Sequence, residues 1–363
     1  MLKHILAINP GSTSTKFAVY QNDKLQFTET IRHNDTEIMK YRTIADQLPF
    51  RLETILACLK ERGFDLGQLD GVAGRGGLLK PVESGTYIIG RELLEDARSC
   101  KYGEHASNLG AILAFEIASY NGIPAFIVDP VGVDEFIEES RLSGLSGLER
   151  KSQVHALNIK AVSRKIAYML GIKLEDANFV VAHLGGGISI AAQQKGKISD
   201  VNNADNEGPF SPERSGTLPV KQLIHLCYSG KYSEQEMLTN ITRKGGIYSY
   251  LGTKNALEAE ERAIAGDGQA ELVLNAMVHQ IGKEIGAMAT VLEGKIDGII
   301  LTGGLAHSEY IIERIQKKIG FLGQVFVVPG EEELEALAAG ALRVLRGEEK
   351  AKEYECFGIK SSK

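Results

Sequence analysis

The sequence predicts an α/β protein of two domains related by an internal duplication, and three observations carry this prediction. The chain has 363 residues, enough for two domains of roughly 150 residues each. Short apolar runs rich in β-branched residues alternate with longer segments of helical character. A strand–turn–strand pattern at residues 2–20 recurs at residues 178–192, with Asn9 and His183 at equivalent places. Two unrelated hairpins would give the same pattern by chance, an alternative that the sequence leaves open.

The first half of the chain opens with two strands joined by a turn at residues 9–14, which is rich in hydroxyl groups. Further strands and helices then alternate. The strands predicted for this half are residues 2–8, 16–20, 87–89 and 125–128, and the predicted helices are residues 43–62 and 108–121.

The second half repeats this plan and adds a strand that ends in Gly303 and Gly304. A helix follows, with Ser308 as its N-cap, so backbone N–H groups at its start would suit a phosphate or a ribose. The predicted strands of this half are residues 178–182, 188–192, 299–304 and 324–328, and the predicted helices are residues 155–170, 271–292, 308–319 and 331–346.

Composition excludes several classes of function. With 41 basic and 47 acidic residues the net charge is −6, which argues against binding of nucleic acid through the overall field. No apolar run approaches the roughly 18 residues that span a bilayer, so no membrane association is expected. The cysteines are far apart, which predicts reduced thiols in a cytoplasmic protein and argues against a zinc site. They are Cys58, Cys100, Cys227 and Cys356.

Glycine-rich and hydroxyl-rich turns after strands are the places where the sequence predicts chemistry. The chain has neither a P-loop pattern nor a G-x-G-x-x-G after a strand. Instead, polar turns occur in both hairpins and after the strand at residues 299–304. Phosphate contacts divided in this way resemble the arrangement in actin, sugar kinases and chaperone ATPases. That resemblance implies two duplicated actin-like, ribonuclease H-like domains with a nucleotide in the cleft between them.

Residues 9–16, Asn-Pro-Gly-Ser-Thr-Ser-Thr-Lys, match the N-x-G-S-[ST]-[ST]-x-K pattern of the acetokinase family. Further stretches follow in the order found in that family, at residues 74–76, 128–130, 154–155, 183–187, 213–216, 302–304 and 331–334. The whole chain therefore resembles the acetokinase family. The resemblance implies transfer of the γ-phosphoryl group of ATP to a small carboxylate with Mg²⁺, giving an acyl phosphate and ADP, in a homo-oligomer.

The resemblance also implies a domain division and a set of site residues. The first domain is expected at residues 1–150, with a C-terminal helix at about 336–363 returning to it, and the second at residues 151–335. The expected catalytic residues are Arg75, His155, His183 and Arg214. The expected phosphate and nucleotide contacts are Asn9, Ser12, Ser14, Lys16, Gly185, Gly186, Gly187, Gly303 and Gly304. The expected metal ligands are Asp129 and Glu332, with the choice between Glu332 and Glu333 open.

Each of these residues also has a structural interpretation. Arginine is always charged and binds carboxylate or phosphate in a bidentate way, yet an arginine beside glycine is also common in surface turns. Histidines are more often structural than catalytic, and asparagine and serine close turns by themselves. Lys16 could be a solvated lysine at the start of a strand, and Asp129 could only cap a turn before proline.

Departures from the acetate-type pattern favour a longer acid, most of all butyrate. Gly76 and Gly77 stand where that pattern has two valines, and Val154 stands where it has phenylalanine before the retained His155. These changes are expected to remove side-chain volume near the carboxylate. Acetate, propionate and branched acids stay as alternative substrates, and a nucleotide-gated switch on the same fold is a more distant one.

Overall fold

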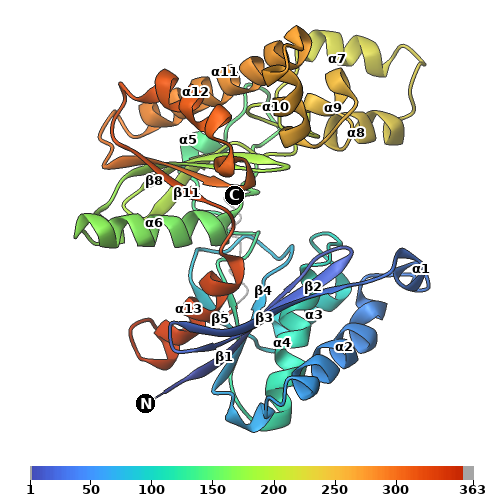
Figure 1. The fold of residues 1–363 in the computed structure, drawn as a ribbon, viewed down its shortest axis with the longest axis vertical. Coiled ribbons are helices and arrows are strands. Elements are labelled where there is room, and N and C mark those ends of the chain that lie inside the picture. The colour runs from blue at the N-terminus through green and yellow to red at the C-terminus, as the bar shows by residue number, and fades with distance from the viewer. Residues whose placement is uncertain (1, 355–363) are drawn as a thin grey trace. The chain divides into compact units, whose positions relative to one another are not determined.

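The computed structural model describes residues 2–354, and these divide into two units (Figure 1). Unit 1 comprises residues 1–133 together with residues from 332 onward, and unit 2 comprises residues 134–331. The first boundary therefore lies at residue 133 rather than at 150. Of the C-terminal segment expected to return to the first domain, residues 355–363 lie outside the described residues.

Unit 1 is built on a six-stranded mixed sheet with the order β3-β2-β1-β4-β6-β5. The strands β1, β2 and β3 are antiparallel neighbours, β4 and β6 run parallel to β1, and β5 closes the edge antiparallel to β6. The bounds are β1 His4–Pro10, β2 Ser14–Gln21, β3 Lys24–Arg32, β4 Gly71–Arg75, β5 Thr86–Ile88 and β6 Ala125–Val128.

Helices cover both faces of this sheet (Figure 1). Helix α13 (Glu333–Leu345) lies on one face, where a Cβ on Gly71 would lie 3.2 Å from Leu345. On the other face Gly74 touches the backbone of Gly110, within α4 (Asn108–Asn121). Because successive strand residues point to opposite faces, β4 is buried on both sides. The other helices of unit 1 are α1 Asp35–Ile38, α2 Leu48–Glu61 and α3 Arg91–Ser99.

Unit 2 is built on a five-stranded sheet with the order β9-β8-β7-β10-β11. The strands are β7 Phe179–Leu184, β8 Ile188–Gln194, β9 Lys197–Val201, β10 Gly298–Gly303 and β11 Val325–Pro329. Helix α6 (Ala156–Leu170) lies on one face, and α11 (Gly268–Val291) and α12 (Glu309–Ile319) lie on the other (Figure 1). Four further helices are α7 Val220–Cys227, α8 Glu234–Thr242, α9 Gly246–Leu251 and α10 Ala256–Ile264, and α5 is Glu138–Arg141.

The two sheets share one topology, which confirms the predicted duplication. Strands β3-β2-β1-β4-β6 of unit 1 correspond in order and direction to β9-β8-β7-β10-β11 of unit 2. Each hairpin also has a register shift at the matching place, at Val19/Tyr20 in β2 and at Ala192/Gln193 in β8. Two unrelated hairpins would not share these features.

One detail at Gly303 and Gly304 differs from the expectation. Gly304 begins a 3₁₀ turn (Gly304–His307) that lies between Gly303 and α12, so neither glycine forms the N-terminus of that helix. The N-cap prediction is confirmed, because Ser308 Oγ accepts a hydrogen bond from the N–H of Ile311 at 3.0 Å. Within residues 2–354, no helix is long and apolar enough to cross a membrane.

Candidate active site

The candidate residues of unit 1 gather at the carboxyl ends of three neighbouring parallel strands. Ile8 of β1 pairs with Gly74 of β4, so Asn9 and Arg75 come next on each strand. Arg75 in turn pairs with Val128 of β6, which places Asp129 just beyond the same edge. Open α/β sheets bind their ligands at the carboxyl ends of such strands.

Arg75 and Asn9 meet the first residue of α13. Strand alternation turns both side chains to the face that α13 covers, at the end where this helix begins. Arg75 Nη1 lies 2.5 Å from Glu333 Oε1 and 3.5 Å from Asn9 Oδ1, and Asn9 Nδ2 donates to the other oxygen of Glu333. A carboxylate is favourable at a helix N-terminus, so Glu333 is held in place by both the helix and the two side chains.

The expected metal ligands Asp129 and Glu332 occupy different settings. Asp129 is 2% exposed, and its backbone has a φ of 39°, in the left-handed region. Its Oδ1 accepts from the N–H of Gly85 at 2.7 Å, and its own N–H donates to Gly85 O at 3.0 Å. Glu332 is exposed at the N-cap of α13, whereas Glu333 is engaged with Arg75.

Carboxylate oxygens at these positions suit Mg²⁺. This ion uses one or two protein carboxylates and completes its shell with water and phosphate oxygens. Among residues 2–354 there is no group of three or more His, Cys, Asp and Glu side chains that could hold a metal alone.

The hydroxyl-rich turn between β1 and β2 carries Ser12 and Ser14 and lies at the carboxyl end of β1. Ser12 is exposed, Ser14 is half-buried, and the N–H of Gly11 donates to Ser14 O at 2.8 Å across the turn. Lys16 is exposed and stands directly opposite Asn9 in the β1–β2 ladder. The turn and Lys16 thus lie beside the group formed by Asn9, Arg75 and Glu333.

A buried polar group beneath this turn was not predicted from the sequence. The fully buried Arg51 of α2 donates to Thr15 Oγ1 at 3.0 Å, and Thr15 Oγ1 lies 2.8 Å from His33 Nε2. Since the threonine oxygen accepts from Arg51, its hydroxyl hydrogen is available to His33. Arg51 lies on the same face of α2 as the buried Ile55 and Leu59. A charged residue at an apolar position of a helix was the feature of the sequence that could have predicted this buried group.

His33 is expected to make the protein less stable in acid. Burial and the nearby Arg51 guanidinium lower the pKa of His33 to about 4. The unfolded chain therefore binds more protons than the folded one between pH about 4 and 6.5, and stability falls as the pH falls through this range. Urea unfolding of wild type and His33→Gln at pH 7 and pH 5 measures the free energy of unfolding. Between these two pH values it should fall less in the variant than in wild type, by up to about 1.4 kcal/mol per pH unit. Parallel pH profiles for the two proteins would contradict this.

In unit 2, His183 is the centre of the candidate group. It lies in β7, is 1% exposed, and faces α6. Its Nδ1 lies 3.1 Å from Asn158 Oδ1, an acceptor, so Nδ1 carries the hydrogen. The opposite ring atom, Nε2, lies 3.1 Å from Glu331 Oε1. The imidazole is thus oriented by α6, with Nε2 directed to the end of the strand.

His155 stacks on His183. It is the N-cap residue of α6, and the two rings have centroids 3.9 Å apart and planes inclined by 10°. His155 Nδ1 lies 3.0 Å from Ser189 Oγ of β8, and Ser189 is the ladder partner of His183. In each unit a helix thus begins at the end of the first strand. In unit 1, Glu333 of α13 contacts Asn9 of β1. In unit 2, His155 at the start of α6 contacts His183 of β7.

His183 and Arg214 both lie against the glycine turn at residues 185–187. A Cβ on Gly185 would lie 3.3 Å from His183 Nε2, and a Cβ on Gly187 would collide with Arg214 Nη1. Only glycine at 187 lets the guanidinium approach this closely. Arg214 is also paired with Asp205 at 2.9 Å, while its Nε is buried without a hydrogen-bond partner in the described part of the chain.

The loop that carries Arg214 is tied to the same turn. Ser211 Oγ donates to Gly186 O at 2.5 Å and accepts from the N–H of Arg214 at 3.1 Å. Gly303 is required at the end of β10, because its φ is 90° and a Cβ would collide with the backbone of Leu184. Gly304 has open space at its Cβ position, so close packing does not require it.

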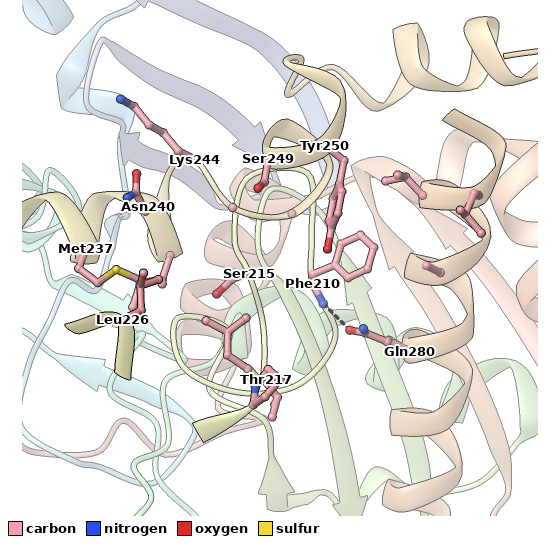
Figure 2. A pocket seen from close by; sticks show the side chains of 18 of the residues that line it. Phe210, Ser215, Thr217, Leu226, Met237, Asn240, Lys244, Ser249, Tyr250 and Gln280 are labelled. Carbon is pink, nitrogen blue, oxygen red and sulfur yellow. Dashed lines mark hydrogen bonds between the residues drawn. The ribbon is translucent and has the colours of Figure 1, made fainter. Parts of the chain in front are cut away.

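A pocket of about 730 Å³ lies elsewhere in unit 2 (Figure 2). Its lining includes apolar Phe210, Met237 and Tyr250 and the amide of Gln280, whose Oε1 accepts from the N–H of Phe210 at 3.1 Å. No candidate residue predicted from the sequence lines it, although the next residue after Arg214 does. The loop that carries Arg214 thus forms part of the pocket wall through the residue that follows Arg214.

Comparison with known proteins decides the family. The chain matches the acetokinase family over residues 146–340, more than half of its length. The chain belongs to the acetokinase family. The match includes His155, His183 and Arg214.

Solved structures of similar fold extend over both units of this acetokinase-family chain. An acetate kinase from Porphyromonas gingivalis has a TM-score of 0.78 at 22% identity, covering 94% of this chain and 100% of that one. A propionate kinase from Francisella tularensis subsp. tularensis SCHU S4 has a TM-score of 0.72 at 20% identity, covering 93% and 98%. An acetate kinase from Entamoeba histolytica has a TM-score of 0.74 at 16% identity, covering 93% and 98%. They confirm the predicted two-domain, actin-like α/β fold.

The expected extra space at Gly76 and Gly77 is absent from this acetokinase-family chain, and that prediction is wrong. A Cβ on Gly76 would lie 2.5 Å from Pro130 Cβ, and one on Gly77 would lie 2.6 Å from Asn108 N and Cα. Both glycines are needed for close packing at the start of α4 and after β6. They provide no room for a longer acid.

Gly77→Val is therefore expected to destabilise the protein, by about 3 kcal/mol or more. Asn108 cannot move away, because its Oδ1 accepts from the N–H of Leu78 and its Nδ2 donates to Gly103 O, both at 2.8 Å. Urea unfolding of Gly77→Val beside Gly90→Ala, whose Cβ would meet open space, measures the effect. A Gly77→Val protein as stable as the Gly90→Ala control would contradict this prediction, because it would show that the start of α4 at Asn108 can move to accommodate the valine.

Proposed function

We propose that the protein transfers the γ-phosphoryl group of ATP to a short-chain carboxylic acid. The observation that carries the proposal is an arginine in each unit beside a polar turn: Arg75 next to Asn9, and Arg214 against Gly187. A carboxylate nucleophile and a phosphate are both anionic, so transfer between them needs cations more than covalent chemistry. Membership of the acetokinase family supports this reaction.

Each group has a proposed role. Arg75 binds the acid and neutralises it, and Arg214 stabilises the charge on the phosphoryl group in transfer. His183 donates a hydrogen bond to that phosphoryl group, and His155 holds the imidazole by stacking. The turn at residues 11–14 with Lys16, the turn at residues 185–187, and Gly303 with Gly304 contact the nucleotide and its phosphates.

Mg²⁺ would be held by Asp129 and by Glu332, the exposed glutamate directly before Glu333. Bound there with the nucleotide, it would neutralise phosphate charge. The homo-oligomeric state and the cytoplasmic location stay predictions from the sequence.

Butyrate is the proposed acid. With Gly76 and Gly77 excluded as a source of space, the remaining support is Val154, buried just before His155, where the acetate-type pattern has phenylalanine. The smaller side chain would admit two more methylenes, each favourable by roughly 0.8 kcal/mol when buried. This gives butyrate an advantage of about tenfold in kcat/KM over acetate.

The test is trapping of acyl phosphate as the hydroxamate, with Mg-ATP and acetate, propionate, butyrate or isobutyrate as acceptor. Hydroxamate that depends on both ATP and an acid supports the carboxylate kinase. ATP hydrolysis without hydroxamate would instead point to the nucleotide-gated switch. A preference for acetate would refute butyrate as the substrate while leaving the reaction in place.

A further inference from the structure

Arg51 binds the backbone of the turn between β1 and β2. Its Nη1 donates to Gly11 O at 2.8 Å and to Ser14 O at 2.9 Å, and its Nη2 donates to Ser12 O at 3.1 Å. The remaining carbonyl of the turn, Thr13 O, accepts from the N–H of His33 at 2.9 Å. All four carbonyl groups of residues 11–14 are therefore held by hydrogen bonds from within the protein.

The direction of these carbonyl groups also fixes the direction of the N–H groups in the turn. In a planar trans peptide the C=O and the N–H of the same unit point in opposite directions. The carbonyls of Gly11 and Ser12 point to Arg51, so the N–H groups of Ser12 and Thr13 point away from it. Ser12 and Thr13 are exposed, so their N–H groups face outward at the turn. Successive outward N–H groups form a concave site for an anion.

The charge of Arg51 adds to this effect. The side chain is 0% exposed, and among residues 2–354 no carboxylate pairs with it. Its other partners are neutral: Thr15 Oγ1, and Gln47 Oε1 at 2.9 Å from Nη2 and 3.1 Å from Nε. A buried cation balanced only by carbonyl and amide dipoles leaves a positive potential at the turn.

We propose that Arg51 is a positioning residue for phosphate binding, which holds the carbonyls of residues 11–14 inward and so directs the N–H groups of Ser12 and Thr13 at phosphate oxygens of the nucleotide. This rests on the proposed function in that the anion is the phosphate chain of ATP or ADP. Arg51 does not touch the nucleotide; it acts through the backbone. Its planar group with five N–H donors can reach three carbonyls, Thr15 and Gln47 at once, which lysine cannot.

The experiment compares Arg51→Lys with wild type and with Arg62→Lys. Arg62 follows the same helix α2, is paired with Glu29 at the surface, and is the matched control. Calorimetric titration with Mg-ADP and with inorganic pyrophosphate should show Kd values at least tenfold higher for Arg51→Lys and unchanged for Arg62→Lys. The KM for the acid should change less than threefold. Selective ¹⁵N labelling should show pyrophosphate-induced shifts of the Ser12 and Thr13 amides in wild type and not in Arg51→Lys.

The outcomes separate positioning from simple stabilisation. A folded Arg51→Lys protein with a lower Tm but wild-type Kd values would overturn the proposal, because a purely structural brace predicts that result. If Arg51→Lys does not fold, Gln47→Leu removes the outer acceptor of the guanidinium and should raise the Kd for pyrophosphate about threefold or more; an unchanged Kd refutes the role. Wild type that forms no acyl phosphate, but whose pyrophosphate binding depends on Arg51, would refute the proposed acceptor and keep this inference.

Discussion

Replacing Arg75 with alanine is expected to lower kcat/KM for the acid by about 10²-fold or more, on the order of 3 kcal/mol of transition-state stabilisation. The guanidinium lies at the end of β4 and is aimed by Glu333 and Asn9, so it can bind an anion with little rearrangement. Arg75→Lys keeps the charge and loses the bidentate geometry, and an intermediate loss of roughly tenfold is expected. Steady-state kinetics with the hydroxamate assay measures both variants.

The ion pair with Glu333 provides the critical control. If Arg75 served only to neutralise Glu333, then Glu333→Gln would lose as much activity as Arg75→Ala, and the double variant would lose no more. We expect Glu333→Gln to lose much less, because the guanidinium would still face the acid. Arg98→Ala removes a surface arginine paired with Glu116 and should stay within twofold of wild type. Arg75→Ala within threefold of wild type would exclude Arg75 from the site.

The sequence predicted the elements whose pattern is local and apolar. The helix at residues 108–121 and the strand at residues 125–128 have the predicted bounds, because most of the helix residues and all of the strand residues are buried and each element ends at a clear turn. Strand β3 was missed since it is largely exposed and polar. Strand β4 was missed because two of its five residues are glycines, which owe their place to close packing against α4 and α13.

The site was predicted as a set of residues but not as a set of contacts. The resemblance supplied Arg75, His183 and Arg214, yet Glu333 and Asn158, which orient two of them, come from helices whose position depends on the whole fold. The sequence also could not say which of Glu332 and Glu333 pairs with Arg75, because that depends on which of them begins the helix beside β4. Volume was the least predictable property: a glycine in the sequence indicates either free space or close packing, and only the fold distinguishes them.

Replacing His183 with alanine is expected to lower kcat by about 10²-fold, with a smaller change in either KM. The reason is geometric: Asn158 Oδ1 accepts from Nδ1–H, so Nε2 is the atom that faces the transferring phosphoryl group, and it donates there when both ring nitrogens carry a hydrogen. That contact strengthens as charge develops, so its loss appears in kcat. His183→Gln places an amide N–H near the Nε2 position and should restore part of the activity. Asn158→Leu leaves the imidazole and removes its orientation, and a loss of roughly tenfold is expected.

A structural explanation makes a different prediction for the same variants. His183 is buried and stacked on His155, so a purely structural histidine would lower Tm when replaced while kcat per folded molecule stayed near wild type. His183→Gln would then restore stability and activity together, whereas a donor to the phosphoryl group restores kcat even where Tm stays low. His279→Ala, which changes an exposed histidine of α11, controls for loss of an imidazole elsewhere in unit 2 and should leave kcat within twofold. If His183→Ala kept wild-type kcat after correction for the folded fraction, the phosphoryl contact would have to come from Arg214 alone.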